Sequence, residues 1–342
     1  MSKNSSTRRE NNFDILRLIL AIVVVFFHAG GAISGSPELA WLPDVFSGHL
    51  AVEGFFAISG FLIFASYERS HSLTDYFLKR AGRILPGYWL ATIFCLAIAF
   101  SEGCFHVGKF LVANLSFANF IQPSIPGLWE TNPGTNVVDG ALWTLKIEVM
   151  FYLIVPLIVW LCRKTRRDAV LWTLFALSIV YRVVVAKHSE TLALQLPGQL
   201  SFFMIGALIH YHQKFFYKYG WWLTAAAGML FVLHKYTGWF APRPAAVATL
   251  TLSAALLLPV VKGPARWGDF SYSTYVLHWP MLQLVAAAGL FALHPWSGLA
   301  LTFLMIAVGA VISWFLVEKP ALDRVHVHAQ RFKDPVPAVI PS

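Results

Sequence analysis

Long apolar runs recur along this sequence and constrain its fold more than any other feature. Ten runs of about 17–25 residues are each long enough to cross a bilayer as a helix, and they cover roughly residues 14–33, 50–68, 84–103, 141–161, 168–186, 196–213, 220–236, 243–261, 269–291 and 298–317. Only 13% of the residues are charged, about half the share that is usual in soluble domains. The runs also lack the alternation of a membrane barrel. The sequence therefore predicts an all-α, polytopic integral membrane protein with about ten transmembrane helices.

The basic residues are distributed unevenly between the two sides of the predicted membrane domain. Most of the 26 lysines and arginines fall in alternate connections and in the two terminal segments, which the positive-inside rule assigns to the cytoplasm. We therefore expect a cytoplasmic N-terminal segment (1–13), a transmembrane domain (14–318) and a cytoplasmic C-terminal tail (319–342). Residues 325–342 of this tail are polar and proline-rich, and we expect them to be poorly ordered. The net charge of +9 follows from this topology, so we expect no nucleic-acid partner.

The first predicted helix carries ionisable residues that a lipid-facing helix would not need. Arg17 and His28 are eleven residues apart, which places them on one face and about 16 Å apart along the axis. Asp14 lies three residues before Arg17 and can pair with it. Ionisable groups inside a membrane are costly and often functional. The alternatives are that Arg17 extends its charge to the interface and that His28 only bonds a neighbouring helix.

Two further predicted helices bring carboxylates to the expected depth of His28. Glu53 lies about one turn into the second run, and Lys146 and Glu148 lie in the first two turns of the fourth, "ALWTLKIEVMFYLIVP", which also carries Trp143. Glu148 and Tyr152, four residues apart, share a helix face. Both carboxylates are candidates for chemistry, and a structural ion pair is the alternative for Glu148.

Two other stretches carry candidate binding residues. In "YFLKRAGRILPGYW", Arg80 and Arg83 project together on a helix, and paired guanidinium groups suit phosphate. Ordinary positive-inside charge explains them equally well. In "FSYSTYVLHWPML", Tyr272 and His278 are polar positions in the ninth run, where packing or an interfacial aromatic belt is the alternative.

Six motifs together resemble the membrane-bound acyltransferase 3 family, which O-acylates cell-surface polysaccharides and related molecules in bacteria. They are "FDILRLILAIVVVFFH", "VEGFFAISGFLI", "KRAGRILPGYW", "LWTLKIEVMFYLIVP", "SYSTYVLHWP" and "VEKP", and they occur in the family's order over residues 13–320. Two positions depart from the pattern. Glu53 stands where an aspartate is common, and Val149 follows Glu148 where many members have a second glutamate.

The resemblance implies transfer of an acyl group, usually acetyl, from cytoplasmic acyl-CoA to a hydroxyl group at or beyond the outer leaflet of the bacterial inner membrane. In that picture Arg80 and Arg83 hold the CoA phosphates and Arg17 lies beside the pantetheine arm. His28 is the general base, and Glu53 and Glu148 orient or balance its imidazole. The acceptor or the channel is lined by Asp14, Trp143, Lys146, Tyr152, Tyr272 and His278.

Acyl-CoA is then a donor substrate, and we expect no permanently bound cofactor. Three cysteines without paired spacing predict neither a disulfide framework nor a metal site. The expected partners are the lipid bilayer, acyl-CoA and a polysaccharide or glycoside acceptor. Two other functions remain open from the residues themselves, a proton-coupled transporter or exporter of a glycan or lipid precursor, and a non-catalytic partner in polysaccharide assembly.

Overall fold

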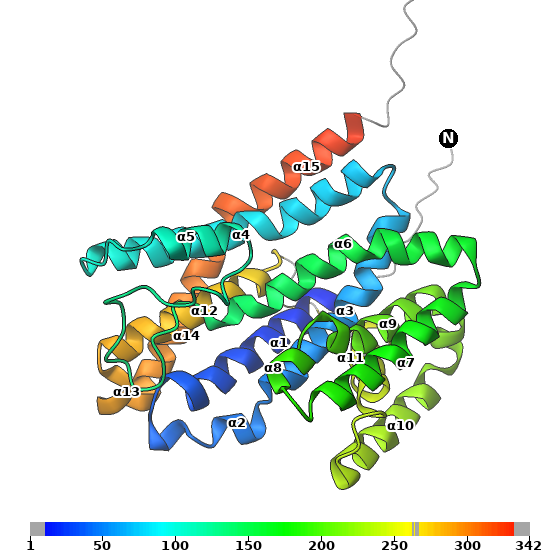
Figure 1. Cartoon of the computed structure of the whole chain (residues 1–342), viewed down its shortest axis with the longest axis horizontal. Helices are drawn as coiled ribbons and strands as arrows, with labels where there is room; N and C mark the ends of the chain where they lie inside the picture. Colours follow the sequence, from blue (N-terminus) through cyan, green and yellow to red (C-terminus); the bar gives the residue numbers. More distant parts are fainter. Residues whose placement is uncertain (1–10, 262, 264–266, 332–342) are drawn as a thin grey trace, which may run out of the picture. The chain divides into compact units, whose positions relative to one another are not determined.

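The fold consists of helices and connecting loops. The computed structural model describes residues 11–261, 263 and 267–331, and Figure 1 labels the helices among them. Within this part of the chain every regular element is a helix and no strand occurs. The predicted all-α class is therefore confirmed. The chain divides into two compact units.

Unit 1 comprises Met1–Val23, Ser47–Ala65 and Leu157–Ser271. It contains the beginning of α1 (Phe13–His28), most of α3 (Gly48–Glu68) and the end of α6 (Trp143–Lys164), together with α7 (Arg167–Val185), α8 (Glu190–Ala193), α9 (Leu196–Tyr211), α10 (Gln213–Thr237) and α11 (Arg243–Leu256). Two glycines let α3 and α9 approach closely. A Cβ atom on Gly60 would overlap the carbonyl of Phe203, and one on Gly206 would overlap the carbonyl of Ala57. Small residues at helix crossings are typical of membrane helix packing.

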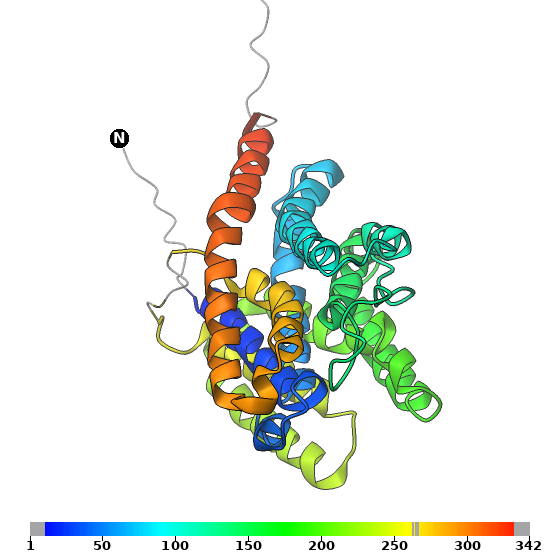
Figure 2. The same ribbon diagram turned by 90° about the vertical axis from the view of Figure 1, so that its left-hand side faces the viewer.

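Unit 2 comprises Val24–Phe46, Ser66–Pro156 and Tyr272–Ser342. It holds the end of α1, most of α6 and the remaining elements, which are η1 (Ala29–Ile33), η2 (Pro37–Leu39), α2 (Leu42–Val45), α4 (Leu73–Ser101), α5 (Gly108–Leu115), η3 (Gly140–Leu142), α12 (Ser271–Ala287), α13 (Leu290–Leu293), α14 (Pro295–Ser313), η5 (Trp314–Glu318) and α15 (Lys319–Arg331). Figure 2 shows α14, η5 and α15 as one nearly continuous column.

The C-terminal tail differs in part from the prediction of a poorly ordered segment over 325–342. Residues Lys319–Arg331 form α15, which packs along α4. Gly82 of α4 makes this possible, because a Cβ atom there would overlap the side chain of Val325. The helix was missed because its polar composition hides an anchoring contact. Residues 332–342, and residues 1–10 of the predicted N-terminal segment, lie outside the described residues.

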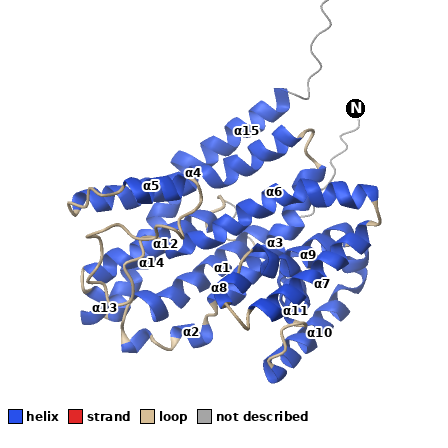
Figure 3. Cartoon of the chain, in the orientation of Figure 1, coloured by secondary structure: helices blue, strands red, loops and turns tan. Residues whose placement is uncertain are grey.

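Every one of the ten predicted runs falls on a helix. By length and composition, seven helices in the described residues can cross a membrane, and they are Phe13–Gly31, Pro37–Glu68, Leu73–Ser101, Gly140–Lys164, Arg167–Val185, Glu190–Tyr211 and Pro295–Val325. The other three runs correspond to α10, α11 and α12. Of these, α11 and α12 are only 14 and 17 residues long, and α10 carries more polar side chains. Figure 3 shows the same helices without their sequence colours. The chain is a multi-pass membrane protein.

Candidate active site

His28 ends α1 at the point where that helix passes into the five-residue π-helix η1. Its Nδ1 atom lies 2.9 Å from Nε2 of His278 on α12, and the two ring planes are nearly parallel, with an interplanar angle of 15° and ring centres 5.1 Å apart. π-Helical turns are rare in proteins, and those that occur are often found at functional sites. The structure thus brings together two histidines that the sequence proposed separately and that lie 250 positions apart.

His278 is held in place by its own helix, α12, which is in turn joined to α6. Its side chain is fully buried, and its Nδ1 atom lies 2.5 Å from the main-chain carbonyl oxygen of Tyr275. The hydroxyl group of Tyr275 lies 2.7 Å from Oγ1 of Thr144, in the first turn of α6. Burial and the contact of Nδ1 with the Tyr275 carbonyl oxygen fix the orientation of the His278 ring.

The loop before α6 is fastened to α12 next to the histidine pair. Nε1 of Trp279 donates to the carbonyl of Val137 at 2.9 Å, and Nε2 of Gln283 donates to the same carbonyl at 2.8 Å. Oε1 of Gln283 accepts from Nδ2 of Asn132 at 2.8 Å. The ring of Trp279 meets His28 edge-on, with ring centres 4.7 Å apart. Trp279 therefore links the loop to the histidine site.

Arg80 and Arg83 form a cationic cluster on α4, and both are half-buried. The guanidinium carbon of Arg80 lies 5.6 Å from the ring centre of Tyr152, and that of Arg83 lies 5.9 Å from the ring centre of Tyr272. The hydroxyl group of Tyr152 donates to Glu148 at 2.7 Å, as the four-residue spacing predicted. Nε of Arg80 is buried and has no hydrogen-bond partner among the described residues. Two such guanidinium groups can bind a phosphate through charge-assisted hydrogen bonds.

One helix, α12, connects the cationic cluster with the histidine pair. The hydroxyl group of Tyr272 donates to the carbonyl of Ile84 on α4 at 2.8 Å. A Cβ atom on Gly87 would overlap the Tyr272 ring, so this glycine permits the close approach of α4 and α12. Tyr272 and His278 are six residues apart, which is about 9 Å along a helix. Six residues also rotate the two side chains about 120° apart around the axis, so a ligand with an anionic group and a reactive group would contact both ends of this segment by crossing the surface of α12.

In unit 1 the predicted site residues form ion pairs. The guanidinium group of Arg17 forms a salt bridge with Asp269. Its Nη2 atom also lies 3.3 Å from Oδ1 of Asp14, so the predicted pairing of Asp14 with Arg17 is confirmed. Glu53 is almost fully buried and accepts a hydrogen bond of 2.9 Å from Nε of Arg243. Each buried charge has an opposite charge beside it, which is how proteins tolerate such groups.

The remaining predicted residues are at the beginning of α6. Trp143 is its first residue and is half-buried. Nζ of Lys146 lies 4.1 Å from the ring centre of Phe120, an arrangement typical of a cation–π contact. Both side chains are therefore on the same part of α6 as Thr144 and Glu148.

Sequence reasoning missed three charged residues. Asp269 and Arg243 are the ion-pair partners of Arg17 and Glu53. Asp269 begins the ninth predicted run at the depth expected for Arg17, and Arg243 begins the eighth at the depth expected for Glu53, so the topology held a signal for both. Glu318, in the "VEKP" motif, is buried and accepts from Ser273 and Ser313.

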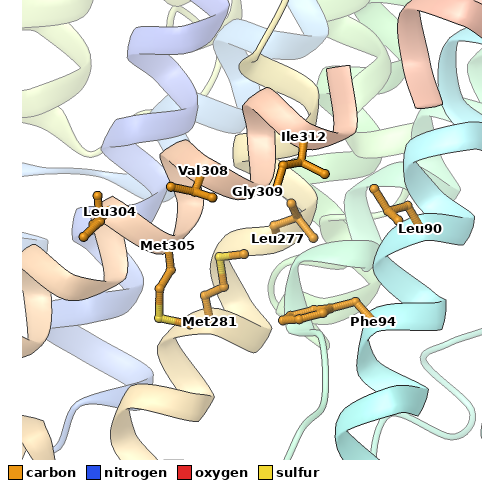
Figure 4. Close-up of a pocket in the computed structure, with 9 residues that line it drawn as sticks. All are labelled: Leu90, Phe94, Leu277, Met281, Leu304, Met305, Val308, Gly309 and Ile312. Carbon is orange, nitrogen blue, oxygen red and sulfur yellow. The ribbon is translucent and has the colours of Figure 1, made fainter. Parts of the chain in front are cut away.

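Unit 2 also contains an apolar cavity of about 500 Å³. Figure 4 shows side chains from α4, α12 and α14 around it, with Leu277 and Met281 contributed by the helix that carries His278. The cavity is lined by Leu90, Phe94, Leu277, Met281, Leu304, Met305, Val308, Gly309 and Ile312. No charged side chain lines it, so it suits a hydrocarbon group and not the nucleotide part of a charged donor.

These observations define a class of protein: a polytopic membrane protein with a histidine pair and a cationic cluster. Residues 10–318 match the family described as an acyltransferase domain. The chain belongs to this acyltransferase family. The predicted family and the prediction of an acyltransferase are confirmed.

Three relatives illustrate the range of the family. The chain is 28% identical to nodulation protein 10 of Rhizobium leguminosarum bv. viciae, over 94% of this chain and 95% of the relative. It is 26% identical to the O-acetyl transferase of Shigella phage Sf6, over 92% and 97%. It is 30% identical to the exopolysaccharide production protein ExoZ of Rhizobium meliloti (strain 1021), over 81% and 90%. No solved structure matches the chain significantly.

Proposed function

We propose that this chain is an O-acetyltransferase that moves an acetyl group from cytoplasmic acetyl-CoA to a hydroxyl group of a cell-surface polysaccharide or of its lipid-linked or glycoside precursor. Family membership supports acyl transfer over the transporter alternative. The names of two relatives support acetyl as the group and an exopolysaccharide as the kind of acceptor. The observation that carries the proposal is the contact of His28 with His278 in unit 2, at one end of a helix segment whose other end lies beside Arg83.

The cationic cluster is the proposed site for the donor. Arg80 and Arg83 bind the phosphate groups of CoA, and the buried Nε of Arg80 supplies a donor for one of their oxygens. Glu148 orients Tyr152 beside Arg80 through its hydrogen bond. The thioester then extends along α12 toward His28, on the segment that ends at His278.

The chemistry requires one proton acceptor beside the thioester. The acceptor hydroxyl oxygen attacks the thioester carbonyl carbon while His28 takes the hydroxyl proton as general base. The tetrahedral intermediate collapses, the carbon–sulfur bond breaks, and the CoA sulfur leaves with the electron pair. The proton returns from His28 to that sulfur, so His28 is neutral again after each transfer.

The same proposal includes the topology and the location. Both termini lie in the cytoplasm, as the distribution of basic residues predicts, and the protein spans the bacterial inner membrane. The cationic cluster then faces the compartment that supplies acyl-CoA.

The other roles that the sequence gave to site residues stay predictions. They are donor binding for Arg17, orientation or charge balance of the His28 imidazole for Glu53 and Glu148, and lining of the channel or acceptor site for Asp14, Trp143, Lys146, Tyr152, Tyr272 and His278.

Mass spectrometry of surface glycans tests the proposed reaction. Glycans from cells with the chain should carry repeat units heavier by the mass of one acetyl group than glycans from cells without it. Membranes from the first cells should also transfer label from radiolabelled acetyl-CoA to this material. Identical glycan masses, together with export that fails only when the chain is missing, would support the transporter instead.

A further inference from the structure

The contacts of His278 fix which of its nitrogens carries a proton. Nδ1 of His278 lies against the main-chain carbonyl oxygen of Tyr275. A carbonyl oxygen only accepts hydrogen bonds, so Nδ1 must be the protonated nitrogen. In a neutral imidazole the other nitrogen is then an acceptor, which makes Nε2 of His278 an acceptor.

The contact between the two rings also fixes which nitrogen of His28 carries a proton. Nδ1 of His28 lies 2.9 Å from Nε2 of His278. Because that Nε2 accepts, Nδ1 of His28 must donate and therefore carries the proton. Nε2 of His28 is then the unprotonated nitrogen, the atom that can take a proton from a hydroxyl group.

We propose that His278 is a positioning residue for the base: it holds His28 in the tautomer protonated at Nδ1 and so makes Nε2 of His28 the proton-accepting atom. The inference rests on the proposed function, in which His28 is the general base. It also goes beyond the predicted role of His278 in lining the site, because it gives His278 a specific action on another residue.

This arrangement suits a base that is protonated and deprotonated in every cycle. When Nε2 of His28 takes the hydroxyl proton, Nδ1 still donates to His278, and the hydrogen bond becomes charge-assisted and stronger. No second proton needs to move. The edge-on ring of Trp279, itself bonded to Val137, limits rotation of the His28 ring.

Nitrogen NMR of the protein tests the tautomer directly. The full chain is labelled in its histidine rings and reconstituted in lipid, and the His28 signals are identified by their loss in His28→Gln. The wild-type protein should show His28 protonated at Nδ1, and His278→Leu should shift the His28 signals toward protonation at Nε2. Protonation of wild-type His28 at Nε2, or unchanged His28 signals in His278→Leu, would overturn the proposal.

Kinetics separates positioning from a purely structural role. In membranes of the producing bacterium, which hold the native acceptor, His278→Leu should lower kcat by about 10- to 100-fold, by analogy with the loss seen when the partner that orients a metal-bound histidine is removed. The KM for acetyl-CoA should stay within about twofold of wild type, because the cationic cluster is untouched. His278→Gln should recover most of the rate, since its amide oxygen can accept from Nδ1 of His28.

Two comparisons make the outcome decisive. His294→Gln is the matched control, because His294 is exposed in the same unit, and it should keep the wild-type rate. A His278→Gln variant as slow as His278→Leu, with both keeping the wild-type melting midpoint, would overturn the proposal. If the wild-type protein transfers no acetyl group, the proposed function fails, while the NMR result still decides the tautomer of His28.

Discussion

The two units use their buried polar residues differently. In unit 1, Arg17 pairs with Asp269 and Glu53 pairs with Arg243, so groups of opposite charge lie in direct contact. In unit 2, the described contact of His28 joins two imidazole rings. An ion pair holds its geometry because separation leaves a charge unbalanced. A contact between two imidazoles leaves one ring able to gain and lose a proton.

The comparison suggests a division of work. In the proposed function, the histidine pair and the cationic cluster of unit 2 carry chemistry and donor binding, and we expect the ion pairs of unit 1 to stabilise the fold. Variants of the ion pairs should therefore change the stability, and variants of the histidine pair and of the cationic cluster should change the kinetics.

Removing both arginines of the cationic cluster should have the largest effect on donor binding. The Arg80→Ala, Arg83→Ala double variant loses two charge-assisted contacts of about 1.5 kcal/mol each, so the KM for acetyl-CoA should rise by about 100-fold. Initial rates against acetyl-CoA concentration measure this change. The matched control replaces two exposed arginines, Arg163 and Arg166, by alanine and should leave the KM unchanged. An equal rise in both double variants would mean that total charge, and not this cluster, attracts the donor.

Breaking one ion pair in unit 1 should lower stability. Arg243→Leu leaves Glu53 buried without its partner, which costs about 3 kcal/mol, and the melting midpoint in detergent should fall. In the Glu53→Gln, Arg243→Leu double variant no buried charge remains, and the midpoint should recover. A double variant as unstable as Arg243→Leu would show that the pair does not act through charge. Loss of acetyl transfer at the recovered midpoint would instead support the predicted catalytic role of Glu53.

Asp139 provides a smaller test, because this acid of unit 2 is buried without a basic partner among the described ion pairs. Burial raises the pKa of the Asp139 carboxyl well above its usual range, although the hydrogen bond from Ala141 opposes the shift. Above the ordinary carboxyl pKa the folded chain keeps a proton that the unfolded chain releases, so stability falls as the pH rises. Asp139→Asn keeps an oxygen that can accept from Ala141 and removes the ionisation. Its melting midpoint should depend less on pH between about 5 and 8, whereas parallel pH curves for the two proteins would refute this account.

The structural features that depend on residues close together in the chain could be predicted from the sequence. Apolar runs predicted the helices, and spacings of three and four residues predicted the contacts of Arg17 with Asp14 and of Tyr152 with Glu148. These depend only on helical geometry. The helix α15 was not readable, because its packing depends on Gly82, far away in the chain.

Contacts between distant helices were the part that the sequence left open. His28 and His278 were both candidates, but their contact depends on how α1 and α12 pack, which spacing along one helix cannot reveal. The expected depth of a residue in the membrane gave part of the answer, because it put Glu53 and Arg243 near the same side of the membrane. Depth alone does not show which helices are neighbours, so the partners of these charges emerged only from the fold.

The most direct test of the central claim is the initial rate of transfer by His28→Gln. Glutamine keeps a polar group of similar size but cannot take a proton at neutral pH. In membranes containing equal amounts of wild-type and variant protein, transfer of label from radiolabelled acetyl-CoA to the surface glycan should fall by about 10³-fold in the variant. The melting midpoint should be unchanged. A variant rate within about tenfold of wild type would contradict the claim that His28 is the general base.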